Sequence, residues 1–131
     1  MEILLTLIVA GVIMGLLDFI WLGYAAKKLY YGAMGNLLRE KPNMAAAVLF
    51  YVIYVVGVVV FAINPALDSG SVWQALSLGA FFGFVAYATY DLTNLSTMKG
   101  FPKKIVVIDM IWGTTLTAVV ATLTYLIIHL L

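Results

Sequence analysis

The chain of 131 residues has no cysteine, one histidine and few charged residues. Without cysteine it can form no disulfide, no thiolate nucleophile and no cysteine-ligated metal site. The single histidine, His129, is too little for a histidine-rich metal or haem site within one chain, so we expect no metal centre and no cofactor. Only 10% of the residues are charged and the formal net charge is +1, which does not indicate a nucleic-acid partner.

Long hydrophobic runs dominate the chain instead. Hydrophobic residues make up 65% of it, which leaves too little polar surface for a soluble domain. A helix needs about 20 apolar residues to cross the hydrocarbon core of a bilayer, and four runs reach that length, roughly at residues 3–24, 44–63, 72–95 and 105–130. They are too long and too uniformly apolar for barrel strands. The sequence therefore predicts one domain over residues 1–131, an all-α four-helix transmembrane bundle whose first partner is the lipid bilayer.

The predicted connections contain all three prolines. Pro42 precedes the second run, where a helix start tolerates proline. Asn64-Pro65 is predicted to end that run, and Pro102 precedes the fourth. The first connection, about residues 25–43, fits a short interfacial helix as well as a helical extension of the first span, and both alternatives stay open.

Positive charge is distributed unevenly among the connections and predicts the orientation. Lysine and arginine occur only in the first and third connections, at Lys27, Lys28, Arg39, Lys41, Lys99, Lys103 and Lys104. The positive-inside rule then puts these two connections in the cytoplasm and both termini outside. Met1 and Glu2 lack the basic region of a cleavable signal, so we expect the first run to be a mature span.

Three aspartates interrupt the predicted spans: Asp18, Asp91 and Asp109. At a rise of about 1.5 Å per residue, each lies roughly 6–9 Å inside the cytoplasmic boundary. An ionisable group in hydrocarbon is costly and usually faces a partner or a wet cavity. We therefore expect the three carboxyl groups to face inward together.

Helical spacing supports inward faces for these aspartates. In the third run Gly79, Gly83, Tyr87 and Asp91 are four residues apart and Asn94 follows three later, so all five share one stripe. Glycines at this spacing allow close helix contact, which predicts that the stripe faces protein.

A similar stripe in the first run consists of Gly11, Gly15, Asp18 and Leu22. Asp18 and Asp109 are each followed three residues later by a tryptophan, Trp21 and Trp112. An indole N–H at this spacing can bond a carboxyl group or close a pocket over it.

Tyrosines belong to the same predicted layer. Tyr51 and Tyr54 come from the second run and Tyr87 and Tyr90 from the third. Tyr54 and Tyr87 lie deeper than an interfacial belt requires, so their hydroxyl groups need partners, and the aspartates are candidates. The cluster could instead be a hydrogen-bond network that only fixes helix register. Interhelical polar contacts average about 0.6 kcal/mol, a small return for burying three acids, so we favour a functional site.

Three segments carry a resemblance to a known family: Phe50-Tyr51, the run from Tyr87 to Asn94 (Tyr-Ala-Thr-Tyr-Asp-Leu-Thr-Asn), and Asp109-x-x-Trp112-Gly113. They resemble a family of small bacterial membrane proteins, the domain of unknown function 2177 family. The resemblance covers nearly the whole chain. It implies a four-span protein of the bacterial inner membrane and brings no activity with it.

Three functions remain open at this stage. The first is binding or transport of a cation or cationic small molecule, through carboxylates and cation–π attraction; a pathway through so few helices predicts a homo-oligomer. The second is an enzyme acting on a lipid or isoprenoid head group, against which stands the lack of any recognisable catalytic motif. The third is an accessory subunit or assembly factor. The predicted ligand-binding residues are Asp18, Trp21, Tyr51, Tyr54, Tyr87, Asp91, Asn94, Asp109 and Trp112.

Overall fold

A computed structural model describes residues 2–26 and 43–131, and within these ranges almost the whole chain is helical. The elements are α1 (Glu2–Ile20), the π-helical turn η1 (Trp21–Ala26), α3 (Met44–Val58), the π-helical turn η2 (Val59–Ile63), α4 (Asn64–Ser69), α5 (Val72–Thr97) and α6 (Lys103–Leu130). Four stretches are long and apolar enough to cross a membrane: Ile3–Gly23, Met44–Ser69, Val72–Thr97 and Lys103–Leu130. The all-α, four-span prediction is confirmed. The proposed interfacial helix falls almost entirely on residues 27–42, outside the described residues.

The second span does not end at Asn64-Pro65, so that prediction is wrong. Helix continues through η2 and α4 to Ser69. Proline lacks an N–H and its ring clashes with the preceding turn of an α-helix, but the wider π-helical turn directly before it relieves both problems. The helix ends where Gly70 adopts a left-handed conformation (φ 69°) and its N–H donates to the carbonyl of Ala66 at 2.8 Å.

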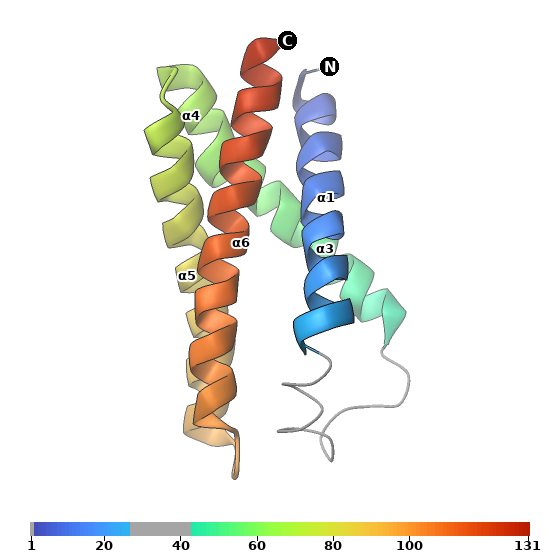
Figure 1. Ribbon diagram of the computed structural model, residues 1–131, viewed down its shortest axis with the longest axis vertical. Helices are drawn as coiled ribbons and strands as arrows, with labels where there is room; N and C mark the ends of the chain where they lie inside the picture. The colour runs from blue at the N-terminus through green and yellow to red at the C-terminus, as the bar shows by residue number, and fades with distance from the viewer. Residues whose placement is uncertain (1, 27–42) are drawn as a thin grey trace.

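Helices α5 and α6 form the tightest pair in the bundle and run antiparallel to each other (Figure 1). Gly79 and Gly83 are buried on the face of α5 that touches α6. A Cβ atom at Gly79 would lie 2.7 Å from the Cβ of Ala121, and one at Gly83 would collide with the backbone carbonyl of Gly113. The glycine stripe of the third run therefore faces protein, as the sequence predicted.

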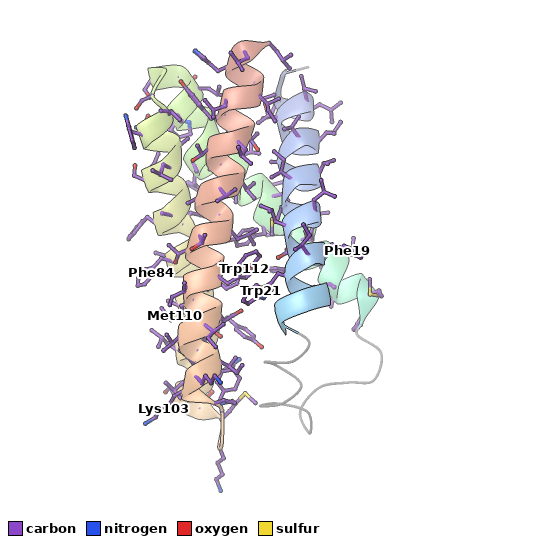
Figure 2. All side chains as sticks on the ribbon, viewed as in Figure 1. Phe19, Trp21, Phe84, Lys103, Met110 and Trp112 are labelled. Atoms are coloured by element: carbon purple, nitrogen blue, oxygen red, sulfur yellow. The ribbon has the colours of Figure 1, made fainter. Side chains whose placement is uncertain are left out.

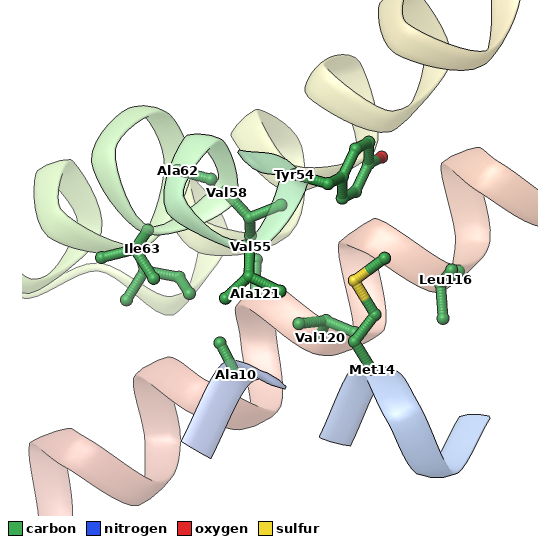
Figure 3. Packing of buried hydrophobic residues seen from close by; sticks show 11 residues of the cluster. Ala10, Met14, Tyr54, Val55, Val58, Ala62, Ile63, Leu116, Val120 and Ala121 are labelled. Atoms are coloured by element: carbon green, nitrogen blue, oxygen red, sulfur yellow. The ribbon is translucent and has the colours of Figure 1, made fainter. Parts of the chain in front are cut away.

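The other two spans pack against this pair. Figure 1 shows α1 beside α6, and α3 slanting behind them toward α5. Both chain ends lie at one end of the bundle, here named the terminal end, and the α5–α6 connection lies at the other, the turn end. Buried apolar side chains from α1, the second span and α6 fill the space between them (Figure 3); they include Ala10, Met14, Val58, Ile63, Leu116, Val120 and Ala121.

The outer surface of the bundle is apolar. Large hydrophobic side chains are exposed on all four spans, for example Val12, Ile53, Phe81 and Ile111. Such a surface is stable against acyl chains and not against water. The chain is therefore a multi-pass membrane protein. One stripe prediction fails here: Leu22 is 62% exposed, and a Cβ atom at Gly11 would meet no atom within 4 Å, so neither residue shares the face on which Gly15 packs against Tyr51.

Candidate functional site

The structure brings together the three aspartates from α1, α5 and α6. Asp91 on α5 and Asp109 on α6 are each less than two helical turns from the α5–α6 connection. Their carboxyl groups are within hydrogen-bonding reach of each other. Asp18 on α1 is half-buried and close enough to Asp109 for the two charges to interact. A layer of carboxyl groups near the turn end is therefore a feature of the folded chain.

Asp91 is the most enclosed of the three. Its side chain is 0% exposed, and neither carboxyl oxygen has a hydrogen-bond donor among the described residues. Two ionised carboxylates offer each other only acceptors, so the contact between Asp91 and Asp109 becomes a hydrogen bond only when one of them carries a proton. A buried acid without a fixed donor serves stability poorly, which makes this pair the strongest candidate for a functional group.

A small apolar cluster closes the bundle between the carboxyl pair and the turn end. Phe101, Ile105 and Val106 are buried, and Leu95 and Met110 pack against them. Leu95 is one turn beyond Asp91 on α5, and Ile105 is one turn before Asp109 on α6. The pair is thus separated from that end of the bundle by hydrocarbon.

The two tryptophans predicted to accompany Asp18 and Asp109 meet each other. The rings of Trp21 and Trp112 stack with centroids 4.4 Å apart and planes 8° from parallel, which fills the space between α1 and α6 (Figure 2). The indole N–H of Trp112 lies close to the carboxyl group of Asp18 across the helix contact, as a donor facing an acceptor. Trp112 therefore contacts Asp18 on α1 and not Asp109, the aspartate that precedes it on α6.

Trp112→Phe is expected to lower the free energy of unfolding by about 1 kcal/mol, because the ring stack survives while Asp18 loses its donor. Trp21→Phe is the matched control, since it trims the same stack without removing that hydrogen bond. Titration with a denaturing detergent measures both variants. Equal losses in the two would mean that the Trp112–Asp18 bond contributes nothing.

The tyrosines of α3 find partners other than the aspartates. The Tyr51 hydroxyl donates to the carbonyl of Gly11 at 2.6 Å, and Gly15 makes room for it, since a Cβ there would lie 3.0 Å from the same oxygen. The Tyr54 hydroxyl lies 2.7 Å from the hydroxyl of Thr117. The expectation that an aspartate satisfies Tyr54 is wrong.

Thr117 is a site residue that the sequence did not reveal. Its hydroxyl donates to the carbonyl of Gly113, 2.8 Å away on the same helix, so Tyr54 must be the donor in their contact. A threonine within a helix commonly donates its hydroxyl proton to a carbonyl of the same helix, so the sequence suggests no further partner for it. Only the approach of α3 to α6 shows that it also accepts.

A cavity of about 300 Å³ lies beside the aspartates. Its lining residues come from α3, α5 and α6: Phe50, Tyr54, Ala86, Tyr87, Tyr90 and Asp109. Of the nine predicted ligand-binding residues, only Tyr54, Tyr87 and Asp109 line it. Among the described residues Asp109 is the one carboxyl group in its wall, and the other lining residues are aromatic or alanine.

The other predicted residues lie outside the cavity wall. Asp91 adjoins Asp109, and the side chain of Asn94 lies close to the hydroxyl of Tyr90, one turn earlier on α5. Asp18, Trp21 and Trp112 form the neighbouring contact between α1 and α6. Phe50 and Ala86 were absent from the prediction, because an apolar side chain in an apolar span carries no signal of its own, and Tyr90 was placed in the predicted layer but not among the ligand-binding residues.

The cavity opens between α3 and α5. Phe50 is 55% exposed and Tyr90 is 57% exposed, whereas Tyr54 deeper inside is only 5% exposed. The ring of Tyr54 packs edge-on against Tyr87, with centroids 6.1 Å apart. The site is therefore a pocket with an aromatic mouth, an aromatic wall and one acid.

No three histidine, cysteine, aspartate or glutamate side chains within the described ranges are arranged to hold a metal ion. The three aspartates share a level but do not form a common cage.

Comparison with known proteins supplies a family and no function. The family model described as "Predicted membrane protein (DUF2177)" matches residues 3–126. No curated protein and no solved structure matches the chain. The match spans the same segments that carry the resemblance in the sequence, and the role of the site must be argued from its geometry.

Proposed function

The chain belongs to the DUF2177 family of predicted membrane proteins, and we propose that it binds an organic cation with an apolar body inside the membrane. The observation that carries this proposal is the pocket of about 300 Å³ in which the described part of the chain places a single carboxyl group, Asp109, in an otherwise mainly aromatic wall. A wall of this kind selects a ligand with one positive charge and an apolar remainder.

The chemistry of the wall matches such a ligand. The faces of Phe50, Tyr54, Tyr87 and Tyr90 attract a cation by about 0.5–2 kcal/mol per ring, more where water is excluded. Asp109 adds carboxyl oxygens to the same wall, where low dielectric strengthens the attraction between opposite charges. The volume is at the lower end of the range for small-molecule sites, which points to a compact amine or quaternary ammonium ion.

The position of the mouth indicates how the ligand arrives. Phe50 and Tyr90 both lie within membrane spans, several residues from the ends of α3 and α5. A pocket that opens there is reached through the bilayer as well as from its surface. The ligand we propose therefore partitions into the membrane before it binds.

The lysines support a cytoplasmic location for the site. Lys99, Lys103 and Lys104 lie at the turn end, the same end as the carboxyl layer, and the positive-inside rule assigns that end to the cytoplasm of a bacterial inner membrane. Transport would require a second opening toward the terminal end, where the core residues now close the bundle. A homo-oligomer would provide further wall for such a path.

An enzyme acting on a lipid head group is less well supported. General acid–base catalysis needs two groups within reach of the substrate, whereas residues 2–26 and 43–131 contribute one carboxyl group, that of Asp109, to the cavity wall.

The proposal predicts binding of benzyltrimethylammonium to the purified protein in detergent. Asp109→Asn is expected to weaken binding at least about tenfold, because it removes roughly 1.4 kcal/mol or more of charge attraction. Isothermal titration calorimetry measures the affinity.

Two controls sharpen the measurement. Asp68→Asn makes the same change of charge in α4, outside the cavity, and is expected to leave the affinity unaltered. The neutral isostere neopentylbenzene tests the need for a cation. Equal affinity in the wild type and Asp109→Asn, or equal affinity for the neutral compound, would refute the proposed function.

A further inference from the structure

The aromatic wall of the cavity is backed by a ring that is not one of its lining residues. Phe82 of α5 packs edge-on against Tyr54, with ring centroids 5.4 Å apart and planes at 63°. It also stacks on Phe61 of the second span, with centroids 6.1 Å apart. Cation binding as proposed above uses the face of Tyr54 and gives Phe82 no part.

Gly57 allows Phe82 to come this close to α3. A Cβ atom at Gly57 would lie 2.7 Å from the tip of the Phe82 ring, closer than side chains approach one another. Gly57 is one turn beyond Tyr54 on α3, so the ring of Phe82 occupies the space directly beside Tyr54. In a close-packed interior a side chain cannot move without displacing its neighbours, and Phe82 therefore restricts the ring of Tyr54.

Tyr54 is held at two further points. Its hydroxyl donates to the Thr117 hydroxyl at 2.7 Å, and its ring meets that of Tyr87 edge-on, with centroids 6.1 Å apart. Only 5% of Tyr54 is exposed. These contacts give the cavity a fixed wall at Tyr54, of which Phe82 is the outer support.

Tyr54 and Asp109 mark opposite ends of the cavity. Both line it, and Thr117, the partner of Tyr54, lies eight residues beyond Asp109 on α6, which is about 12 Å along the helix axis. In the proposed function the ammonium head binds at Asp109, so the apolar body of the ligand points toward Tyr54. The position of the Tyr54 ring therefore limits the length of that body.

We propose that Phe82, seated on Gly57, fixes Tyr54 and so restricts the site to cations whose apolar body is about one aromatic ring long. This inference rests on the proposed function. Phe82 touches no ligand and acts through Tyr54, which makes it a positioning residue for ligand length. Asp109 selects the charge of the ligand, and the Phe82–Tyr54 contact selects its size.

The test compares two cations with the same ammonium head, benzyltrimethylammonium and its longer para-phenyl analogue. Phe82→Ala leaves an apolar space behind Tyr54 into which a longer body can reach. The affinity for the longer cation relative to the shorter should rise about tenfold, as measured by isothermal titration calorimetry. Phe82→Leu keeps more of the packing and should change the ratio in the same direction by a smaller factor.

Phe81→Ala is the matched control. It removes an equal ring from the neighbouring position, where Phe81 is 66% exposed on the outer surface, and it should keep the wild-type ratio. A loss of packing alone would weaken both cations together and leave the ratio unchanged. An unchanged ratio in Phe82→Ala and Phe82→Leu would overturn the proposal.

A second measurement needs no ligand. The two ring carbons beside the Tyr54 hydroxyl give separate NMR signals while the ring is held and one averaged signal when it flips. The isotope-labelled wild type should show two signals, Phe82→Ala one, and Phe81→Ala two. Failure of the wild type to bind either cation would refute the proposed function alone, because these signals still decide whether Phe82 holds Tyr54. One averaged signal in the wild type, or two in Phe82→Ala, would refute the positioning role alone.

Discussion

Gly83→Val is expected to lower the free energy of unfolding by about 3 kcal/mol or more, at the upper end of the range for overpacked positions. Any side chain at Gly83 meets the backbone carbonyl of Gly113 and the side chain of Thr117. Backbone cannot turn aside as a flexible side chain can, so α5 and α6 would have to separate. Their separation would also pull Tyr87 and Asp91 away from α6, and the site should be lost with the packing.

Gly11→Val is the matched control for this substitution. A Cβ at Gly11 has no atom within 4 Å, so the same change on α1 adds surface toward lipid and should alter stability by less than about 0.5 kcal/mol. Unfolding by a denaturing detergent, followed by circular dichroism, compares the two variants. Similar midpoints would show that the close approach of α5 and α6 is not what holds the pair together.

The fold followed from the sequence because the bilayer sets its own length scale. A run of about 20 apolar residues has one common solution in a membrane, a spanning helix, and all four predicted runs are helices. The failure at Pro65 has an equally physical cause. The π-helical turn η2 that accommodates the proline depends on how Val59 and Ile63 pack in the core, and the local sequence does not encode that packing.

The candidate site was accessible to sequence analysis only in part. The distance of each aspartate from the end of its span predicted that Asp18, Asp91 and Asp109 would lie at one level, because the rise per residue of a helix is fixed. The cavity wall depends instead on the slant of α3, which brings Phe50 and Tyr54 opposite α5. No periodicity within one span encodes the angle at which another crosses it, so the pairing of Tyr54 with Thr117 and the mouth between α3 and α5 could not be predicted.

The double variant Asp91→Asn with Asp109→Asn decides whether the acids serve function or only helix register. Asparagine has nearly the shape of aspartate, and two amides can bond each other without a buried charge. We expect the free energy of unfolding to rise by about 1–3 kcal/mol, because a buried group with unmet hydrogen bonds is replaced by a neutral pair. Binding of benzyltrimethylammonium should be abolished in the same protein.

A gain in stability joined to a loss of binding is what a functional site maintained at the expense of stability predicts. The single variant Asp18→Asn separates this effect from a general response to removing acids, since Asp18 has the indole N–H of Trp112 as donor, and its loss should not stabilise the bundle. If the double variant instead unfolds more easily than the wild type by about 1 kcal/mol or more, the carboxyl pair contributes to the packing of α5 against α6. The case for a site at Asp109 would then depend on the cavity alone.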